Sequence, residues 1–178
     1  MPLYEHLKKY GTHSGYDAPP VGDIQPFELA LTEEEILARG IQYVIAAAHW
    51  SLGAPPERDA YIREWHRQQM QMALDPRVDI LGHPWWCSGT WKDEKYPQLR
   101  RLWFDDFSVI PASMHDELAS ALLSRDCCAE INISMIQTQN YEYTERFRTQ
   151  YLEYMRYLFE RGVRITYGSD LHSRPYAD

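Results

Sequence analysis

The feature that most constrains this chain is a regular alternation of short apolar segments with longer segments of helical periodicity. Four apolar runs of only a few residues are separated by stretches whose apolar residues recur at helical spacing. Short apolar runs suit strands buried on both faces, as in a parallel sheet, and the alternation favours right-handed helical crossovers. We therefore expect an α/β fold with strands at 42–48, 78–81, 127–133 and 163–167 and helices at 32–40, 57–74, 113–124 and 142–161.

Local signals mark the ends of these helices. Thr32 and Glu35 have the spacing of a capping box, in which each side chain accepts a hydrogen bond from the other residue's backbone N–H. Ser113 is expected to cap the third helix. Gly40 and Gly162 suit the position after a helix C-terminus, where the backbone often becomes left-handed.

The length and composition predict one globular domain, residues 1–178. The chain has 178 residues, 44% of them hydrophobic and 25% charged, which is enough to bury a core without disulfides. Glycine and proline punctuate residues 1–28, so this segment is expected to be irregular, and residues 85–110 are expected to form a long loop. The formal net charge of -8 makes nucleic acid an unlikely partner.

Cysteine usage and hydropathy bear on the compartment. The three cysteines include no CxxC pair, and Cys127 and Cys128 lie in an apolar segment where buried free thiols are expected. No apolar run approaches the ~20 residues of a membrane span. The first residues lack the apolar core of a signal peptide. We therefore expect a cytoplasmic protein that does not enter a membrane.

Histidine and aspartate residues follow three of the four expected strands. His49 follows the first strand and His83 the second, while Asp170 and His172 follow the fourth. The carboxyl ends of parallel strands share one edge, where barrels place their active sites. Imidazole and carboxylate are the usual ligands of Zn²⁺, Mn²⁺ and Fe²⁺. This arrangement predicts a divalent metal site.

Other polar residues in these segments have structural interpretations. His66 lies in the middle of a helix and is interpreted as a surface or packing residue, and His115 in a first helical turn as solvated. Glu130 and Asn132, with Ser134, form an alternating polar set along the third strand. We interpret Glu130 as a buried, hydrogen-bonded residue of the sheet.

Several segments resemble the PHP (polymerase and histidinol phosphatase) family over about residues 29–174. They are Tyr43-Val-Ile-Ala-Ala-Ala-His49, Val78-Asp-Ile-Leu-Gly-His-Pro84, Ala129-Glu-Ile-Asn132 and Tyr167-Gly-Ser-Asp-Leu-His-Ser173. The resemblance implies a distorted TIM-like (β/α)7 barrel, here with about four recognisable strands. It also implies up to three divalent metals and the hydrolysis of phosphate esters.

The resemblance also implies roles for single residues. His49 and His83 would share one metal, Asp170 would ligate a second and His172 a third, so Asp170 and His172 are candidate catalytic residues. The family's Gly-x-Glu segment has its nearest equivalent in Gly15-Tyr16-Asp17, which makes Asp17 a further candidate ligand.

The sequence departs from the family at its start. The His-x-His motif and the following Asp-His segment have no counterpart here. An incomplete barrel would expose sheet edges that invite pairing with another chain. We therefore expect either a homodimer or an N-terminal segment that this sequence does not contain.

The function expected from these residues is metal-dependent hydrolysis of a small phosphorylated substrate. Arg174, just after His172, is a candidate phosphate contact because its guanidinium is a fork of donors. One alternative is an amidohydrolase-like enzyme that cleaves a C–N or C–O bond, although lysine occurs only at positions 8, 9, 92 and 95, none at a strand end. A second alternative is a degenerate, non-catalytic member of the family.

Overall fold

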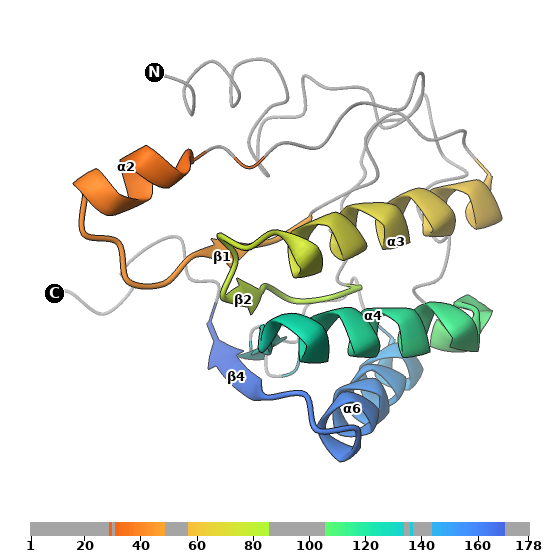
Figure 1. Cartoon of the computed structure of the whole chain (residues 1–178). Helices are drawn as coiled ribbons and strands as arrows, with labels where there is room; N and C mark the ends of the chain where they lie inside the picture. The colour runs from red at the N-terminus through yellow and green to blue at the C-terminus, as the bar shows by residue number, and fades with distance from the viewer. Residues whose placement is uncertain are drawn as a thin grey trace, which may run out of the picture.

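The computed structural model describes residue 29, residues 31–48, 57–85 and 106–133, residue 136, and residues 144–169. Helices and strands alternate along them, as Figure 1 shows. The elements are α2 (Glu33–Ala38), β1 (Ile45–Ala46), α3 (Arg58–Leu74), β2 (Ile80–Leu81), the 3-10 helix η2 (Phe107–Val109), α4 (Ala112–Arg125), β3 (Cys128–Asn132), α6 (Glu145–Glu160) and β4 (Ile165–Gly168).

The four strands form one parallel sheet in the order β1-β2-β3-β4. Each strand pairs with the next one along the chain. Leu81 of β2, for example, is paired with Ala46 of β1 on one side and with Ala129 of β3 on the other. On β4, Ile165 lies beside Ala129 and Gly168 beside Asn132. The prediction of an α/β fold with parallel strands is confirmed. Because all strands run the same way, their carboxyl ends lie along one edge.

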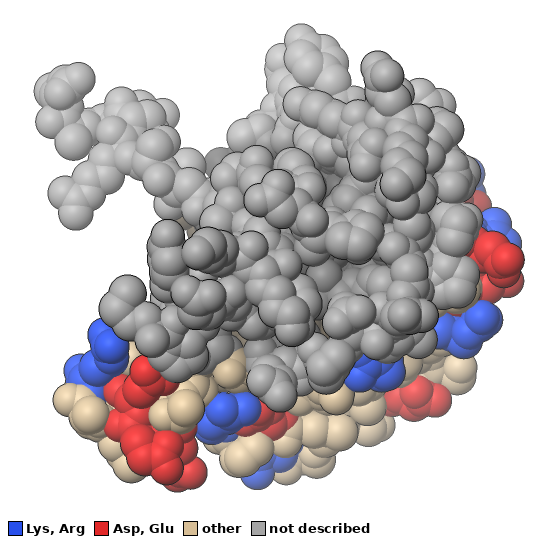
Figure 2. Space-filling model, turned by 90° about the horizontal axis from the view of Figure 1, so that it is seen from above, with Lys and Arg blue, Asp and Glu red and all other residues tan. Residues whose placement is uncertain are grey.

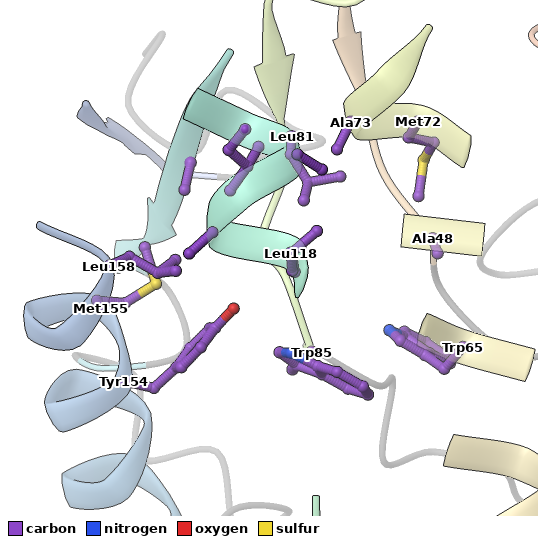
Figure 3. Close-up of a cluster of buried hydrophobic side chains, with 14 of the residues drawn as sticks. Ala48, Trp65, Met72, Ala73, Leu81, Trp85, Leu118, Tyr154, Met155 and Leu158 are labelled. Carbon is purple, nitrogen blue, oxygen red and sulfur yellow. The ribbon is translucent and has the colours of Figure 1, made fainter. Parts of the chain in front are cut away.

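Helices α3 and α4 lie side by side, and α6 crosses beside α4 (Figure 1). One face of the sheet packs against the helices through small and branched residues such as Ala46, Leu81 and Ala129, all of which are buried. Figure 3 shows Leu81 of β2 close to Leu118 of α4, with Trp85 at the lower end of the same core. Residues at alternate positions of a strand face the opposite side, so Glu130 belongs to the other face of the sheet.

The helix ends follow the local sequence signals at most positions. The Thr32 hydroxyl accepts a hydrogen bond from Glu35 N at 3.2 Å, and the Glu35 carboxylate accepts one from Thr32 N at 3.0 Å. The capping box is therefore confirmed. Gly40 and Gly162 follow their helices with left-handed φ values of 62° and 93°, as glycine allows without strain.

The start of α4 corrects one prediction. The helix begins at Ala112, with Pro111 as the preceding cap residue, so Ser113 lies inside the first turn and caps nothing. Proline has its φ fixed near the helical value and no N–H to satisfy, which suits a helix start. The last residues of the predicted loop 85–110 are also not irregular, since Phe107–Val109 form the 3-10 helix η2. Asp106 caps this helix by accepting a hydrogen bond from Ser108 N at 3.0 Å.

Charged side chains of the described residues are mixed by sign on the face seen in Figure 2, where blue and red atoms alternate along the rim. Some of them pair directly, as Arg164 does with Asp126 at 2.9 Å. Among the described helices, none is long and apolar enough to cross a membrane.

Candidate functional site

The turn after β2 has an unusual backbone. His83 has a φ of 29° and Trp85 a φ of 60°, and both are non-glycine residues in the left-handed region. Such a conformation costs roughly 1–2 kcal/mol per residue unless the surroundings fix it. Here the surroundings do so, since Trp85 N donates to the Gln69 side-chain oxygen at 2.8 Å and the indole is fully buried. The turn places the His83 side chain, 4% exposed, at the carboxyl edge of the sheet.

The Glu130 carboxylate lies beside this turn. Glu130 is buried in the middle of β3, and its Oε2 accepts a hydrogen bond from His83 N at 3.1 Å. The two neighbouring segments present glycine to it. A Cβ added at Gly168 would lie 1.6 Å from Glu130 Oε1, and one added at Gly82 would lie 3.4 Å from Oε2. The absence of a side chain at Gly168 is what makes room for the carboxylate, whereas at Gly82 a Cβ would only touch it.

Two further polar groups lie at the same end of β3. Asn132 is fully buried at the last position of the strand. The hydroxyl of Tyr151, which is also fully buried, donates to the Glu130 carbonyl oxygen at 3.5 Å. Burial is the main cause that raises the pKa of Tyr151, so the phenol stays protonated and remains a donor. We call His83, Glu130, Asn132 and Tyr151 the strand-end cluster.

An aromatic wall adjoins the strand-end cluster through Trp85. The His66 ring stacks on Trp85 with centroids 6.0 Å apart and planes 2° apart, and His115 meets its edge at 5.9 Å. Phe107 stacks on His115 at 5.5 Å. Figure 3 shows the Tyr154 hydroxyl directed towards Trp85.

The sequence-based interpretation holds for His66 of this wall but not for His115. His66 is a packing residue, as expected, and its Nε2 lies 2.8 Å from a carboxylate oxygen of Glu117. His115 is partly buried, so our interpretation of it as a solvated residue is wrong. Phe107 and Tyr154, which come from η2 and α6, cover its ring with centroids at 5.5 and 4.6 Å. A position in a first helical turn says nothing about the elements that pack over it.

The buried environment of His115 predicts an acid-sensitive step in stability. Burial is the largest cause that lowers the pKa of His115 from 6.5 to about 4, and nearby His66 adds to it while Asp116 opposes it. The unfolded chain therefore binds a proton below pH 6.5 that the folded chain binds only near pH 4. We expect the free energy of unfolding to fall by roughly 2 kcal/mol between pH 6.5 and 4, as measured by urea denaturation.

A His115→Phe variant is the control for this prediction. It keeps a ring against Phe107 and Tyr154 without a titrating group, so the loss between pH 6.5 and 4 should largely disappear. The pKa values of Asp75, Asp106 and Asp116 are lowered chiefly by hydrogen bonds, and the stability they contribute is lost mainly below their ordinary value of 3.8. Glu34, whose pKa is lowered from 4.5 chiefly by a backbone hydrogen bond, adds a smaller loss that both proteins share. An equal loss in the variant would show that another group titrates in that window.

A cavity of about 460 Å³ opens beside the aromatic wall. Its described lining residues come from η2, α4 and α6 and include His115, Gln150 and Tyr157. None of these described lining residues comes from a strand.

The structure describes only some of the predicted site residues. His83 lies at the carboxyl edge of the parallel sheet, as predicted. Glu130 is buried and hydrogen-bonded, as we interpreted it, but its contact with the His83 backbone was not predicted. The remaining candidates lie outside the described residues: Asp17, His49, Asp170, His172 and Arg174.

The donor set at the strand end fits part of a divalent metal site. The His83 imidazole is a ligand type for Zn²⁺, Mn²⁺ and Fe²⁺, while the Glu130 carboxylate accepts a hydrogen bond from the His83 backbone N–H. Within residues 29–169, as far as the structure describes them, no group of three His, Cys, Asp or Glu side chains lies close enough to hold a metal. A complete site therefore needs ligands from other segments.

Of the two described cysteines, Cys127 is unsuited to act as a nucleophile. Cys127 and Cys128 are free thiols, and Cys127 is buried. Burial raises the pKa of Cys127 to about 11, which keeps it a protonated, unreactive thiol near neutral pH. The prediction of a buried free thiol is confirmed for Cys127.

Comparison with protein-family models, with curated proteins and with solved structures finds no match for this chain.

Proposed function

We propose that this chain is a divalent-metal-dependent phosphoesterase built on part of a parallel TIM-like barrel. The observation that carries the proposal is a buried histidine beside a buried carboxylate at the carboxyl edge of the sheet, where Glu130 accepts a hydrogen bond from the backbone N–H of His83. A buried charge lowers stability unless it is paired or hydrogen-bonded, so a carboxylate at this place favours a functional role. Parallel α/β folds also bind their substrates at this edge. The sequential strand order is that of a barrel, which supports the same proposal.

Five residues would take part in metal binding. His83 and His49 would hold one divalent ion, with Asp170 and His172 at neighbouring positions and Asp17 as a further ligand. Such an ion supplies Lewis-acid polarisation of a phosphoryl oxygen and a water with a pKa near neutrality. His83 must remain neutral to keep a free lone pair for this role.

Substrate binding in this proposal depends on two parts of the chain. Arg174 would bind the phosphate through its planar donors. The buried Trp85 and the strand-end cluster exclude water from the inner side of the site, since Trp85, Asn132 and Tyr151 are fully buried. The substrate class is a small phosphate monoester.

We predict that the protein hydrolyses an aryl phosphate with added Mn²⁺ or Zn²⁺ and loses the activity with a chelator. The 178-residue chain should bind at most one divalent ion tightly, because the family's first motifs are absent. His49→Ala or His83→Ala should abolish that binding, whereas His172→Ala should leave most of it. Metal analysis of purified variants measures the ion content independently of activity.

The outcomes separate the rival functions. Hydrolysis of an amide or lactone in place of the phosphate ester would favour an amidohydrolase-like enzyme. Bound metal with no hydrolysis of any substrate would favour a non-catalytic domain. Loss of the ion in His172→Ala with retention in His49→Ala would show that the roles assigned to these residues are wrong.

A further inference from the structure

The Glu130 side chain touches both chain segments that lead into predicted metal ligands. On one side it accepts a hydrogen bond from the backbone of His83 at 3.1 Å. On the other side its Oε1 lies against Gly168, only two residues before Asp170 in sequence. Glu130 itself lies between them on β3, which pairs with β2 and β4. One carboxylate thus joins two separate strand ends.

The hydrogen bond falls at the position where the backbone most needs support. His83 has a φ of 29°, a conformation that residues with a Cβ rarely adopt. This N–H is buried, and leaving it without an acceptor would cost the full free energy of removing it from water. A carboxylate is the strongest acceptor a side chain offers. The contact therefore stabilises the one turn that determines where the His83 imidazole lies.

Simple packing does not explain a carboxylate at this place. The Glu130 side chain is 8% exposed and lies between Gly82 after β2 and Gly168 of β4. A smaller apolar side chain could occupy this space without removing a charge from water. Gly82 is crowded on its other side too, where an added Cβ would lie 3.0 Å from Ala47 Cβ. The backbone is therefore arranged around the carboxylate.

We propose that Glu130 is a positioning residue, which fixes the His83 turn through its backbone N–H and abuts the β4 end at Gly168, so that the ligands following both strands are held in place. This inference rests on the proposed function, because it assigns Glu130 a part in building that metal site. Glu130 acts through the backbone of His83 and not as a ligand.

Two substitutions at one position test the inference. Glu130→Gln keeps the length of the side chain and an acceptor oxygen, so Mn²⁺ affinity should stay within about threefold of the wild type. Glu130→Leu removes the acceptor, and we expect Mn²⁺ affinity to fall about 10- to 100-fold, the usual effect of losing a group that orients a metal ligand. Amide hydrogen exchange at His83 should accelerate by about tenfold or more in Glu130→Leu but not in Glu130→Gln.

Glu64 provides a matched control, because it is also a buried glutamate. It is 4% exposed on α3 and pairs with Arg67 at 2.5 Å, within its own helix. Glu64→Leu should lower stability while leaving Mn²⁺ affinity and His83 amide exchange as in the wild type. Equal effects of Glu64→Leu and Glu130→Leu on Mn²⁺ affinity would overturn the inference.

The readouts distinguish failure of the inference from failure of the proposed function. A wild-type chain that binds no Mn²⁺ would refute the metal-dependent function, while exchange at the His83 amide still judges the positioning role. Unchanged exchange in Glu130→Leu would overturn the inference whatever the metal does. A loss of Mn²⁺ affinity in Glu130→Gln as large as in Glu130→Leu would overturn it as well, since the charge and not the hydrogen bond would then matter.

Discussion

Replacing Gly168 with alanine is expected to lower the free energy of unfolding by about 3 kcal/mol or more, at the upper end of the usual cost of overpacking a core. The new Cβ would lie 1.6 Å from Glu130 Oε1 and 2.5 Å from its Cδ. Neither partner can move easily, because Gly168 is paired with Asn132 in the sheet and Glu130 is hydrogen-bonded to His83 N. Urea denaturation of the wild type and the variant measures the loss.

Two matched variants separate this steric effect from the general cost of replacing glycine. Gly40 has a φ of 62° and no atom within 4 Å of an added Cβ, so Gly40→Ala should cost only the roughly 1 kcal/mol of a left-handed alanine. In a Glu130→Ala background the clash is absent, and Gly168→Ala should then cost little. The resulting coupling energy should be about 2 kcal/mol or more. Additive effects of the two substitutions would refute the contact between Glu130 and Gly168.

The parallel sheet could be predicted because burial on both faces produces a distinctive sequence. Segments such as 78–81 and 163–167 are short and apolar, and they alternate with periodic segments too long to be strands. The strand limits were less predictable, because β1 and β2 form a paired ladder of only two residues each. The extent of a strand depends on its partner, which the local sequence does not specify.

The strand-end position of His83 follows from the same logic, whereas the part played by Glu130 does not. Its contacts depend on the register that places β3 between β2 and β4, and on glycines at positions 82 and 168. The signal that could have indicated them is a glycine at the end of each neighbouring strand beside a polar residue in the central one. Recognising it requires the strand order, which the sequence suggests only through the alternation of elements.

The partial burial of His115 shows the same limit for helices. Its neighbours Asp116 and Glu117 are exposed, so the local sequence indicates a solvated turn. The rings of Phe107 and Tyr154 that cover it come from positions 8 residues before and 39 residues after it. Such contacts are set by how α6 and η2 pack on α4 and leave no periodic pattern near His115.

Trp85→Ala should lower the free energy of unfolding by about 4 kcal/mol, within the usual range for a fully buried aromatic residue. Trp85 is 0% exposed and contacts the rings of His66 and His115. Alanine would leave a cavity between α3 and α4 while keeping the left-handed φ of 60° and its strain. Because Trp85 lies two residues after His83, the same change should also weaken Mn²⁺ binding, which equilibrium denaturation and metal titration would measure side by side.

Two further variants test the physical reasons for this loss. Phe159→Ala removes an aromatic side chain that is 66% exposed, so it should change stability by no more than about 0.5 kcal/mol. Trp85→Gly removes the same indole but relieves the strain of the positive φ. The glycine variant should therefore be at least as stable as the alanine variant, whereas at ordinary core positions glycine is the less stable of the two. A Trp85→Gly protein that is about 1 kcal/mol less stable than Trp85→Ala would contradict the left-handed backbone at this position. If Trp85→Ala were as mild as Phe159→Ala, the indole would not be part of the core, and the water-excluding wall assigned to the strand-end site would be refuted.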